Sequence, residues 1–319
     1  MKTTLIIDCD PGVDDATGLL VAFAASELDL LAITTVGGNV PASRTARNAC
    51  ILRQIAERPD VPVFAGADHP LVREPAGAGE FHGEEGLGDL VPFETLMGVE
   101  DEHAVDALIR LVMKRPANSV TLILMGPMTN LALALRKEPR LAQHLKEVVA
   151  MGGARTEGGN ITASAEFNIW ADPDAAHEVM QSGARVVMIG LDVTHDVRAT
   201  EERICAVEAI GNASADASAA MLRFSQRIEH TIVGWHSAPL HDPCTVAYVL
   251  APDIFTLKPA RIDIETQSDL TRGHTAVEMR VEGVTAPHLW AAQVDAQRVY
   301  DLIGANLTKA NGANTGAAQ

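Results

Sequence analysis

The segment LIIDCDPGVDDA, residues 5–16, indicates both the fold class of the chain and the place of its functional site. Its apolar start, Leu5–Ile7, predicts a short buried strand, and residues 17–26 predict the body of the helix that follows. Pro11 and Gly12 predict the turn between them, because both residues favour turn conformations. The same order of strand, turn and helix recurs along the chain, so this segment is the first unit of a repeating α/β pattern.

Further apolar runs predict strands, and amphipathic stretches between them predict helices. The predicted strands are residues 28–36, 61–65, 120–125, 148–151 and 185–189, and the predicted helices are 42–57, 103–114 and 173–181. Apolar strands that alternate with helices are typical of a parallel sheet covered on both faces. We therefore expect an α/β fold with an open, mostly parallel (mixed), Rossmann-like central β-sheet flanked by helices, and ligands bound at the carboxyl ends of its strands.

The pattern predicts a single domain over residues 1–307, because no linker divides the chain, followed by a small, polar tail at 308–319 that we expect to fray. Two stretches break the alternation. Residues 66–88 are rich in Gly, Pro and Glu and predict a long loop, which in a compact domain is usually functional. Residues 201–230 are helical and polar, and could form a flap or a subunit contact.

The composition excludes some partners. The 319 residues include 25 basic and 42 acidic side chains, a net charge of −17, which disfavours binding to nucleic acid or to an anionic membrane. No apolar run reaches the roughly 20 residues needed to cross a bilayer, and the first apolar run is too short for a signal peptide. The four cysteines form no CxxC pair. We expect a cytoplasmic protein.

Four aspartates, Asp8, Asp10, Asp14 and Asp15, lie within eight residues at the first predicted turn. Helix capping accounts for one or two of them. Each like-charged pair at about 4 Å costs on the order of 4 kcal/mol at an effective dielectric constant near 20, and a bound cation would remove that cost. Ligands that are all oxygen favour Ca²⁺ or Mg²⁺ over zinc. The pattern predicts a metal site.

Polar residues also follow the other predicted strands or precede later helices. They form the segments 37–39, 126–130, 151–153, 159–160, 166–168 and 239–243. Asn and Glu side chains beside a hard cation suit the hydroxyl groups of a sugar, because the two residue types together donate and accept hydrogen bonds. Each segment alone is a weak signal, since Asn is common in turns.

Taken together, these segments resemble the inosine-uridine-preferring nucleoside hydrolase (nucleoside N-ribohydrolase) family. The matching motifs are DCDPGVDD at 8–15, GN at 38–39, GPMTN at 126–130, MGG at 151–153, EFN at 166–168 and HDP at 241–243. They run in order from residue 5 to about residue 250. Cys9 stands where the family commonly has a hydroxyl residue. The resemblance implies the nucleoside hydrolase fold and hydrolysis of ribonucleosides to ribose and free base in nucleoside salvage, dependent on Ca²⁺.

The resemblance also implies roles for particular residues. Calcium would be held by the carboxylates of Asp10, Asp15 and Asp242 and by the backbone carbonyl of Met125. Asp10 would also be the general base for the attacking water, while His241 would protonate the leaving base. This assignment suits an oxocarbenium-like transition state, which carboxylates stabilise, and the pKa range of histidine. In another interpretation, His241 only orients Asp242.

Ribose recognition is implied for residues on both sides of this site. The 2′- and 3′-hydroxyl groups would contact Asp14, Asn39 and Asn168, and the 5′-hydroxyl group would contact Asn160 and Glu166. His82 would face the base and Phe167 the base or the ribose, although a surface histidine and a core phenylalanine are the simpler interpretations. The base pocket would be completed by the helix at 221–235, with Arg227, His230, Trp235 and His236 as candidates. Having both His82 and His241 favours pyrimidine or broad activity.

The family resemblance also implies a homodimer or homotetramer. Two other functions remain open. A metal-dependent phosphatase with an aspartate nucleophile would need a basic phosphate cradle, yet Arg155 is the one basic residue in or near these segments. A non-catalytic nucleoside-binding protein on the same fold would be expected to lose Asp10 or His241, and both are present.

Overall fold

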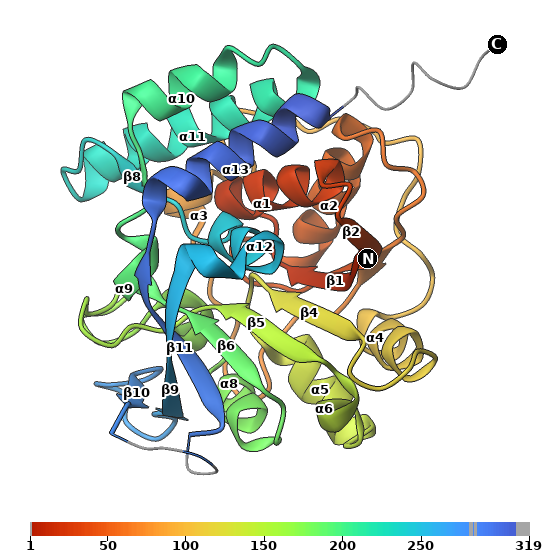
Figure 1. Cartoon of the computed structure of the whole chain (residues 1–319), viewed down its shortest axis with the longest axis vertical. Coiled ribbons are helices and arrows are strands. Elements are labelled where there is room, and N and C mark those ends of the chain that lie inside the picture. The colour runs from red at the N-terminus through yellow and green to blue at the C-terminus, as the bar shows by residue number, and fades with distance from the viewer. Residues whose placement is uncertain (1, 281–282, 284–285, 311–319) are drawn as a thin grey trace.

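A nine-stranded β-sheet forms the centre of the molecule (Figure 1). The computed structural model describes residues 2–280, 283 and 286–310. In spatial order the strands are β10 (Thr275–Glu278), β9 (Phe255–Ile264), β11 (His288–Val294), β6 (Val186–Ile189), β5 (Glu147–Met151), β4 (Val120–Leu124), β1 (Thr3–Cys9), β2 (Leu28–Thr35) and β3 (Val63–Ala65). The strands from β11 to β3 pair in parallel, and β9 is antiparallel to both of its neighbours. The predicted open, mostly parallel mixed sheet is confirmed.

Helices cover both faces of the sheet (Figure 1). One face carries α1 (Val13–Ala24), α2 (Ala42–Ile55), α10 (Glu201–Glu208), α11 (Ala213–Ile232), α12 (Pro243–Leu250) and α13 (Ala296–Lys309). The other carries α4 (Ala104–Met113), α5 (Thr129–Lys137), α6 (Leu141–His144) and α8 (Pro173–Gln181). Short connecting elements are α3 (Gly79–His82), α7 (Phe167–Ala171), α9 (Leu191–Thr194), η1 (Pro252–Ile254) and the β7 (Arg198–Ala199) and β8 (Ala238–Pro239) pair. None of the helices in the described part of the chain combines the length and apolar character that a bilayer crossing requires.

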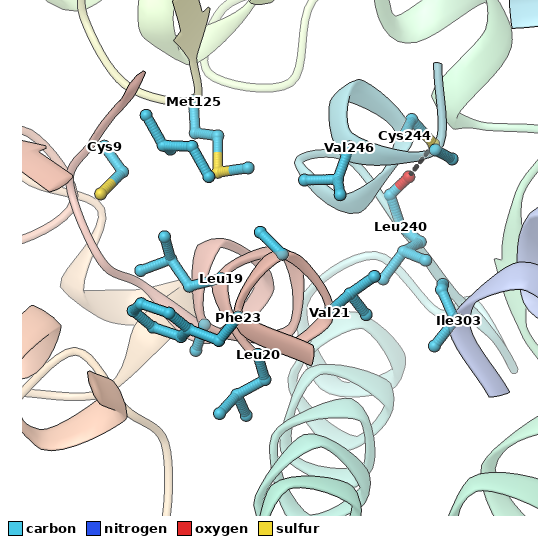
Figure 2. Packing of buried hydrophobic residues seen from close by; sticks show 14 of the residues in the cluster. Cys9, Leu19, Leu20, Val21, Phe23, Met125, Leu240, Cys244, Val246 and Ile303 are labelled. Carbon is cyan, nitrogen blue, oxygen red and sulfur yellow. Dashed lines mark hydrogen bonds between the residues drawn. The ribbon is translucent and has the colours of Figure 1, made fainter. Parts of the chain in front are cut away.

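The strands are apolar throughout because successive side chains enter opposite cores. On β4, Ile123 packs into the core under α1, while Leu122 and Leu124 pack into the core under α5. Figure 2 shows the first of these cores, where the side chain of Met125 lies beside α1. A Cβ atom at Gly18 of α1 would come 3.0 Å from the Met125 methyl group. The Met125 side chain thus serves packing, which leaves its backbone for the site.

Some boundaries differ from the sequence prediction. Helix α1 ends at Ala24, two residues before the predicted end. It begins at Val13, and the Asp15 carboxylate in its first turn accepts a hydrogen bond from Gly12 N (3.0 Å) and caps that turn. The predicted loop at 66–88 contains the short helix α3. Helix α13 continues to Lys309, so the tail predicted from residue 308 was placed too early: Lys309 pairs with Glu27 at 3.2 Å. Residues 311–319 of that tail lie outside the described residues.

The strand order changes direction at β1. Strands β2 and β3 lie on one side of it, and β4, β5 and β6 lie on the other. In open α/β sheets, ligands bind outside the carboxyl ends of the strands at such a switch point. Asp10 directly follows β1 and Met125 directly follows β4, and Met125 N donates to Asp8 O (2.8 Å). The topology therefore places the two residues next to each other.

Candidate active site

A cavity of about 310 Å³ opens beside this switch point, a size that suits a small organic ligand. Ten residues predicted for the site line it: Asp14, Asn39, His82, Met125, Asn160, Glu166, Phe167, Asn168, His241 and Asp242. Asp10 and Asp15 are fully buried directly behind the lining. The structure thus gathers residues that lie more than two hundred positions apart in the sequence. We call the part around Asp10, Asp14, Asp15 and Asp242 the acidic end.

Asp10 is held in a tight backbone cradle. Its Oδ2 accepts a hydrogen bond from Asn39 N (2.7 Å), and its Oδ1 is buried with no partner among the residues that the structure describes. A Cβ atom on Gly38 would come 2.0 Å from Oδ2, and one on Gly126 would come 2.5 Å from Oδ1. Burial raises the pKa of Asp10 well above its usual range, and the charge of Asp15 acts in the same direction. The carboxylate is therefore fixed in position and destabilised by its surroundings.

Asp14, Asp15 and Asp242 meet at one point, where one carboxylate oxygen from each lies within 4.8 Å of the others. Asp242 arrives from the start of α12, and the other two from the first turn of α1. Burial and the neighbouring charges raise the pKa of Asp15 to about 7 and that of Asp242 well above its usual range. The family resemblance implied Asp10, Asp15 and Asp242 as the metal-binding carboxylates. In the structure, the three carboxylates that lie closest together are those of Asp14, Asp15 and Asp242, and Asp10 lies next to them, with its N donating to Asp15 Oδ1.

Two amide side chains tie the acidic end to the backbone. Asn39 Nδ2 donates to Asp15 Oδ2 (3.1 Å) and to Asp10 O (3.2 Å). Asn168 Nδ2 donates to the Met125 carbonyl (2.7 Å) and to the Met151 carbonyl (3.3 Å). A carbonyl oxygen has two lone pairs, so Met125 O retains acceptor capacity at the acidic end.

Glu166 and Asn160, both predicted to bind a hydroxyl group, also shape the local backbone. Glu166 caps α7, accepting from Asn168 N (2.8 Å), Ile169 N (3.2 Å) and Gly153 N (3.0 Å). Burial raises its pKa to about 7. Asn160 is exposed, and its Oδ1 accepts from Phe167 N (2.9 Å). The Glu166 oxygens are already hydrogen-bonded, so a ligand would share them with the helix N-terminus.

The two predicted histidines come from different elements. His82, at the end of α3, has Nδ1 at 3.2 Å from Val13 N and 3.9 Å from Asp14 Oδ1, and its side chain is 13% exposed. It is therefore not a surface histidine. His241 Nδ1 lies 2.8 Å from the Thr194 hydroxyl group, and burial lowers its pKa to about 4. Thr194, and not Asp242, is the hydrogen-bond partner that orients His241 in the described structure.

The opposite part of the cavity is lined by Ile228, Glu229, Val233 and Trp235. The sequence analysis expected a base to bind there, so we call this part the base end. Of its four candidates, Trp235 alone lines the cavity. Arg227 is exposed and pairs with Asp89 (2.6 Å), and the rings of His230 and His236 stack on each other 5.1 Å apart. Helix α11 ends at Ile232, so the loop after it, rather than the helix, brings Trp235 to the cavity.

Several lining residues were missed by sequence reasoning. Helix α11 turns Ser225, Ile228 and Glu229 to the cavity, and the loop after α9 contributes His195. The spacing i, i+3, i+4 marks one helix face, and this signal was available. Which face meets the cavity depends on the packing of α11 against α1, which the sequence alone does not show.

Comparisons with known proteins agree with the fold. Residues 5–301 match the model of the inosine-uridine preferring nucleoside hydrolase family. The chain is 42% identical over 305 residues to the inosine-uridine preferring nucleoside hydrolase of Crithidia fasciculata, covering 95% of this chain and 96% of that one. It is 40% identical over 309 residues to a pyrimidine-specific ribonucleoside hydrolase of Salmonella gallinarum, covering 96% and 99%.

A solved structure gives the same result. The purine-preferring ribonucleoside hydrolase from Gardnerella vaginalis superimposes with a TM-score of 0.89 at 32% identity, covering 96% of this chain and 98% of that one. The fold and cavity thus define an enzyme of the nucleoside hydrolase class. The chain belongs to the inosine-uridine preferring nucleoside hydrolase family, and the predicted family, fold and enzyme class are confirmed.

Proposed function

We propose that this protein hydrolyses the N-glycosidic bond of ribonucleosides to ribose and free base, in a reaction that depends on Ca²⁺. The observation that carries the proposal is a nucleoside-sized cavity with buried carboxylates at one end and aromatic and histidine side chains at the other. Such a cavity can hold a polar sugar and a flat base at the same time. Family membership supports the same reaction.

The residues of the acidic end fit a hard cation. Within the described part of the chain, Asp10 Oδ1, Asp14 Oδ1 and Asp242 Oδ1 are buried without hydrogen-bond partners. Ligands made of oxygen alone suit Ca²⁺, which takes six to eight of them. The carboxylates of Asp10, Asp15 and Asp242 and the carbonyl of Met125 would hold the ion, with Asp14 at its edge. When bound, calcium neutralises the carboxylates and lowers the pKa of an attached water molecule.

The residues around the ion would bind the ribose. Asp14, Asn39 and Asn168 would bind the 2′- and 3′-hydroxyl groups, and Asn160 and Glu166 would bind the 5′-hydroxyl group. Bond cleavage develops positive charge on the sugar, which a fixed ring of carboxylate and amide oxygens stabilises. Among the described residues, Asp10 has a buried carboxylate oxygen without a hydrogen-bond partner, which suits a general base that takes a proton from the attacking water.

His241 would assist departure of the base. With the Thr194 hydroxyl group donating to Nδ1, the neutral imidazole would carry its proton on Nε2, and His241 lines the cavity. His82 and Phe167 would lie beside the base or the ribose. We place this activity in nucleoside salvage in the cytoplasm, in a homodimer or homotetramer of chains whose single domain covers residues 1–307, with exposed apolar side chains at 91–99 as a contact surface.

The alternative functions lack comparable support. A phosphatase would need basic side chains around the phosphate, but the described residues that line the cavity include no Lys or Arg. A non-catalytic binding protein would have no use for the glycine cradle that fixes the free oxygen of Asp10.

The test is ribose release from inosine, adenosine, guanosine, uridine and cytidine, with and without a calcium chelator. We expect turnover that the chelator abolishes and added Ca²⁺ restores. Ca²⁺ at about 100 times its dissociation constant should also stabilise the fold by about 2.7 kcal/mol, measured as a rise in Tm. Full activity in the chelator would contradict the calcium assignment, and no ribose release from any nucleoside would contradict the proposed reaction.

A further inference from the structure

The base end has a flat aromatic wall. The guanidinium group of Arg198 lies over the Trp235 ring, 4.1 Å from its centre, and the His195 ring meets the same indole edge-on at 5.4 Å. Ile228 and Val233 add apolar surface. These contacts hold the indole in place, and a rigid indole beside aliphatic side chains is a suitable surface for a planar heterocycle.

One polar side chain at this wall has unused hydrogen-bonding capacity. Glu229 on α11 lines the cavity, and its Oε2 is buried and has no hydrogen-bond partner among residues 2–280, 283 and 286–310. The other carboxylate near this end, Glu157, is already bonded to His195 Nδ1 (3.0 Å). Burial raises the pKa of Glu229, and the charge of Arg198 acts in the opposite direction and favours the ionised form. An unpartnered buried acceptor of this kind is costly, so a ligand donor that satisfies it gains affinity.

We propose that Glu229 determines base specificity, by accepting hydrogen bonds from N–H groups on the far edge of the nucleobase, and that it favours guanosine. An ionised carboxylate has two acceptor oxygens and no donor. Guanine presents its ring N1–H and its amino group side by side, which matches two carboxylate oxygens. This inference rests on the proposed function and deepens it.

The other bases match this edge less well. Hypoxanthine has the N1–H group but lacks the amino group. Adenine places a ring acceptor beside its amino group, and uracil has its N3–H group between two carbonyl oxygens. A carbonyl or ring nitrogen directed at the carboxylate of Glu229 would leave two acceptors facing each other, which is unfavourable in a partly buried site.

The experiment compares guanosine with inosine, two substrates that differ by the amino group alone. In Glu229→Gln, which keeps the size of the side chain, one oxygen acceptor is replaced by a donor. We expect the ratio of kcat/KM for guanosine to that for inosine to fall about tenfold or more, as for loss of a hydrogen bond to a charged group. Glu202→Gln, at an exposed position on α10, is the matched control and should leave the ratio unchanged.

Two measurements keep the outcomes separate. If Glu229→Gln lowers the rates on both substrates equally, or changes nothing, the specificity role is wrong while the proposed reaction stands. If the wild-type enzyme hydrolyses no nucleoside, the proposed reaction fails, and binding of free guanine and hypoxanthine by calorimetry decides the role of Glu229. Should the Gln variant unfold, Glu229→Ala is tested in the same way. A guanine preference that is lost in the variant supports the role, and its persistence overturns it.

Discussion

The acidic end and the base end of the cavity are built in different ways. The acidic end is formed by strand ends and helix starts, is almost fully buried, and is fixed by hydrogen bonds such as those of Asn39 to Asp10 and Asp15. The base end is formed by one helix face and the loop that follows it, where Trp235 is half-buried and Val233 is 48% exposed. The first part is rigid because the sheet fixes it, while the second can vary without disturbing the sheet.

This difference indicates a division of labour. Every ribonucleoside carries the same sugar, so the part that would bind the ribose and carry out the chemistry can be constant. The bases differ, so the part that would bind them must be adjustable. Relatives named for pyrimidine and for purine preference share this fold or sequence. Substitutions at the acidic end should therefore abolish turnover, and those at the base end should change substrate preference.

The largest effect is expected for Asp10→Asn. The variant keeps the shape of the side chain but removes the proposed general base, so kcat should fall by about 10³- to 10⁴-fold, measured by ribose release with saturating Ca²⁺. Asp101→Asn, at an exposed position, is the control and should retain activity. Activity of the Asp10 variant within tenfold of the wild type would show that the acidic end does not carry the chemistry.

The next largest effect is a pH dependence of the free energy of unfolding that arises from the buried carboxyl group of Glu166. Burial raises the pKa of Glu166 from 4.5 to about 7 in the folded protein, so the folded state binds this proton more tightly than the unfolded state. The stability contributed by the protonated form is complete below pH 4.5 and is lost as the pH rises to about 7. The loss amounts to about 3 kcal/mol.

Urea denaturation from pH 4.5 to pH 7.5, compared between the wild type and Glu166→Gln, measures this cost. The Gln variant cannot titrate at this position, so the free energy of unfolding of the wild type relative to the variant should decrease across the range. A constant difference would mean that folding does not shift the pKa of Glu166. The loss of α7 capping bonds in the variant changes the size of the difference but not its slope.

A smaller effect is expected for His241→Ala. Without the proposed donor, kcat on inosine should fall about 10²-fold. The rate on p-nitrophenyl riboside should change much less, because its leaving group departs without protonation. Equal losses on both substrates would assign His241 a structural role through Thr194 instead. The comparison of these two substrates therefore tests whether His241 acts on the leaving base.

The smallest effect is expected for Trp235→Ala. Loss of the aromatic wall should raise KM about tenfold with little change in kcat, because stacking of this kind contributes about 0.5–1.5 kcal/mol beyond buried area. Steady-state kinetics on inosine and uridine give both values. A fall in kcat with KM unchanged would contradict the division between the two ends.

The sequence predicted the acidic end more completely than the base end, and the reason is physical. Asp10 and Met125 follow apolar strands, and the carboxyl ends of parallel strands meet at one edge of the sheet. Asp242 is not on that sheet, and it was identified through the family resemblance. Glu229 was missed because its position depends on how α11 rotates against α1, and neither helix alone determines that rotation.

The loop at 66–88 shows an intermediate case. Its length predicted a function, and its His-Gly pair matched the family, but its path to the site could not be derived from local pattern. The structure shows that His82 accepts from Val13 N at the start of α1 (3.2 Å). A contact between residues 69 positions apart depends on the tertiary fold, so only the resemblance pointed to it.

The glycine cradle around Asp10 has a consequence for protein engineering. One added methyl group at Gly38 or Gly126 would overlap the Asp10 carboxylate. Even a substitution by alanine would therefore disturb Asp10 at either position. Libraries that randomise these turns will consist mostly of inactive clones. Directed evolution of new substrate preferences should instead sample the α11 face, where side chains can change size without reaching the sheet.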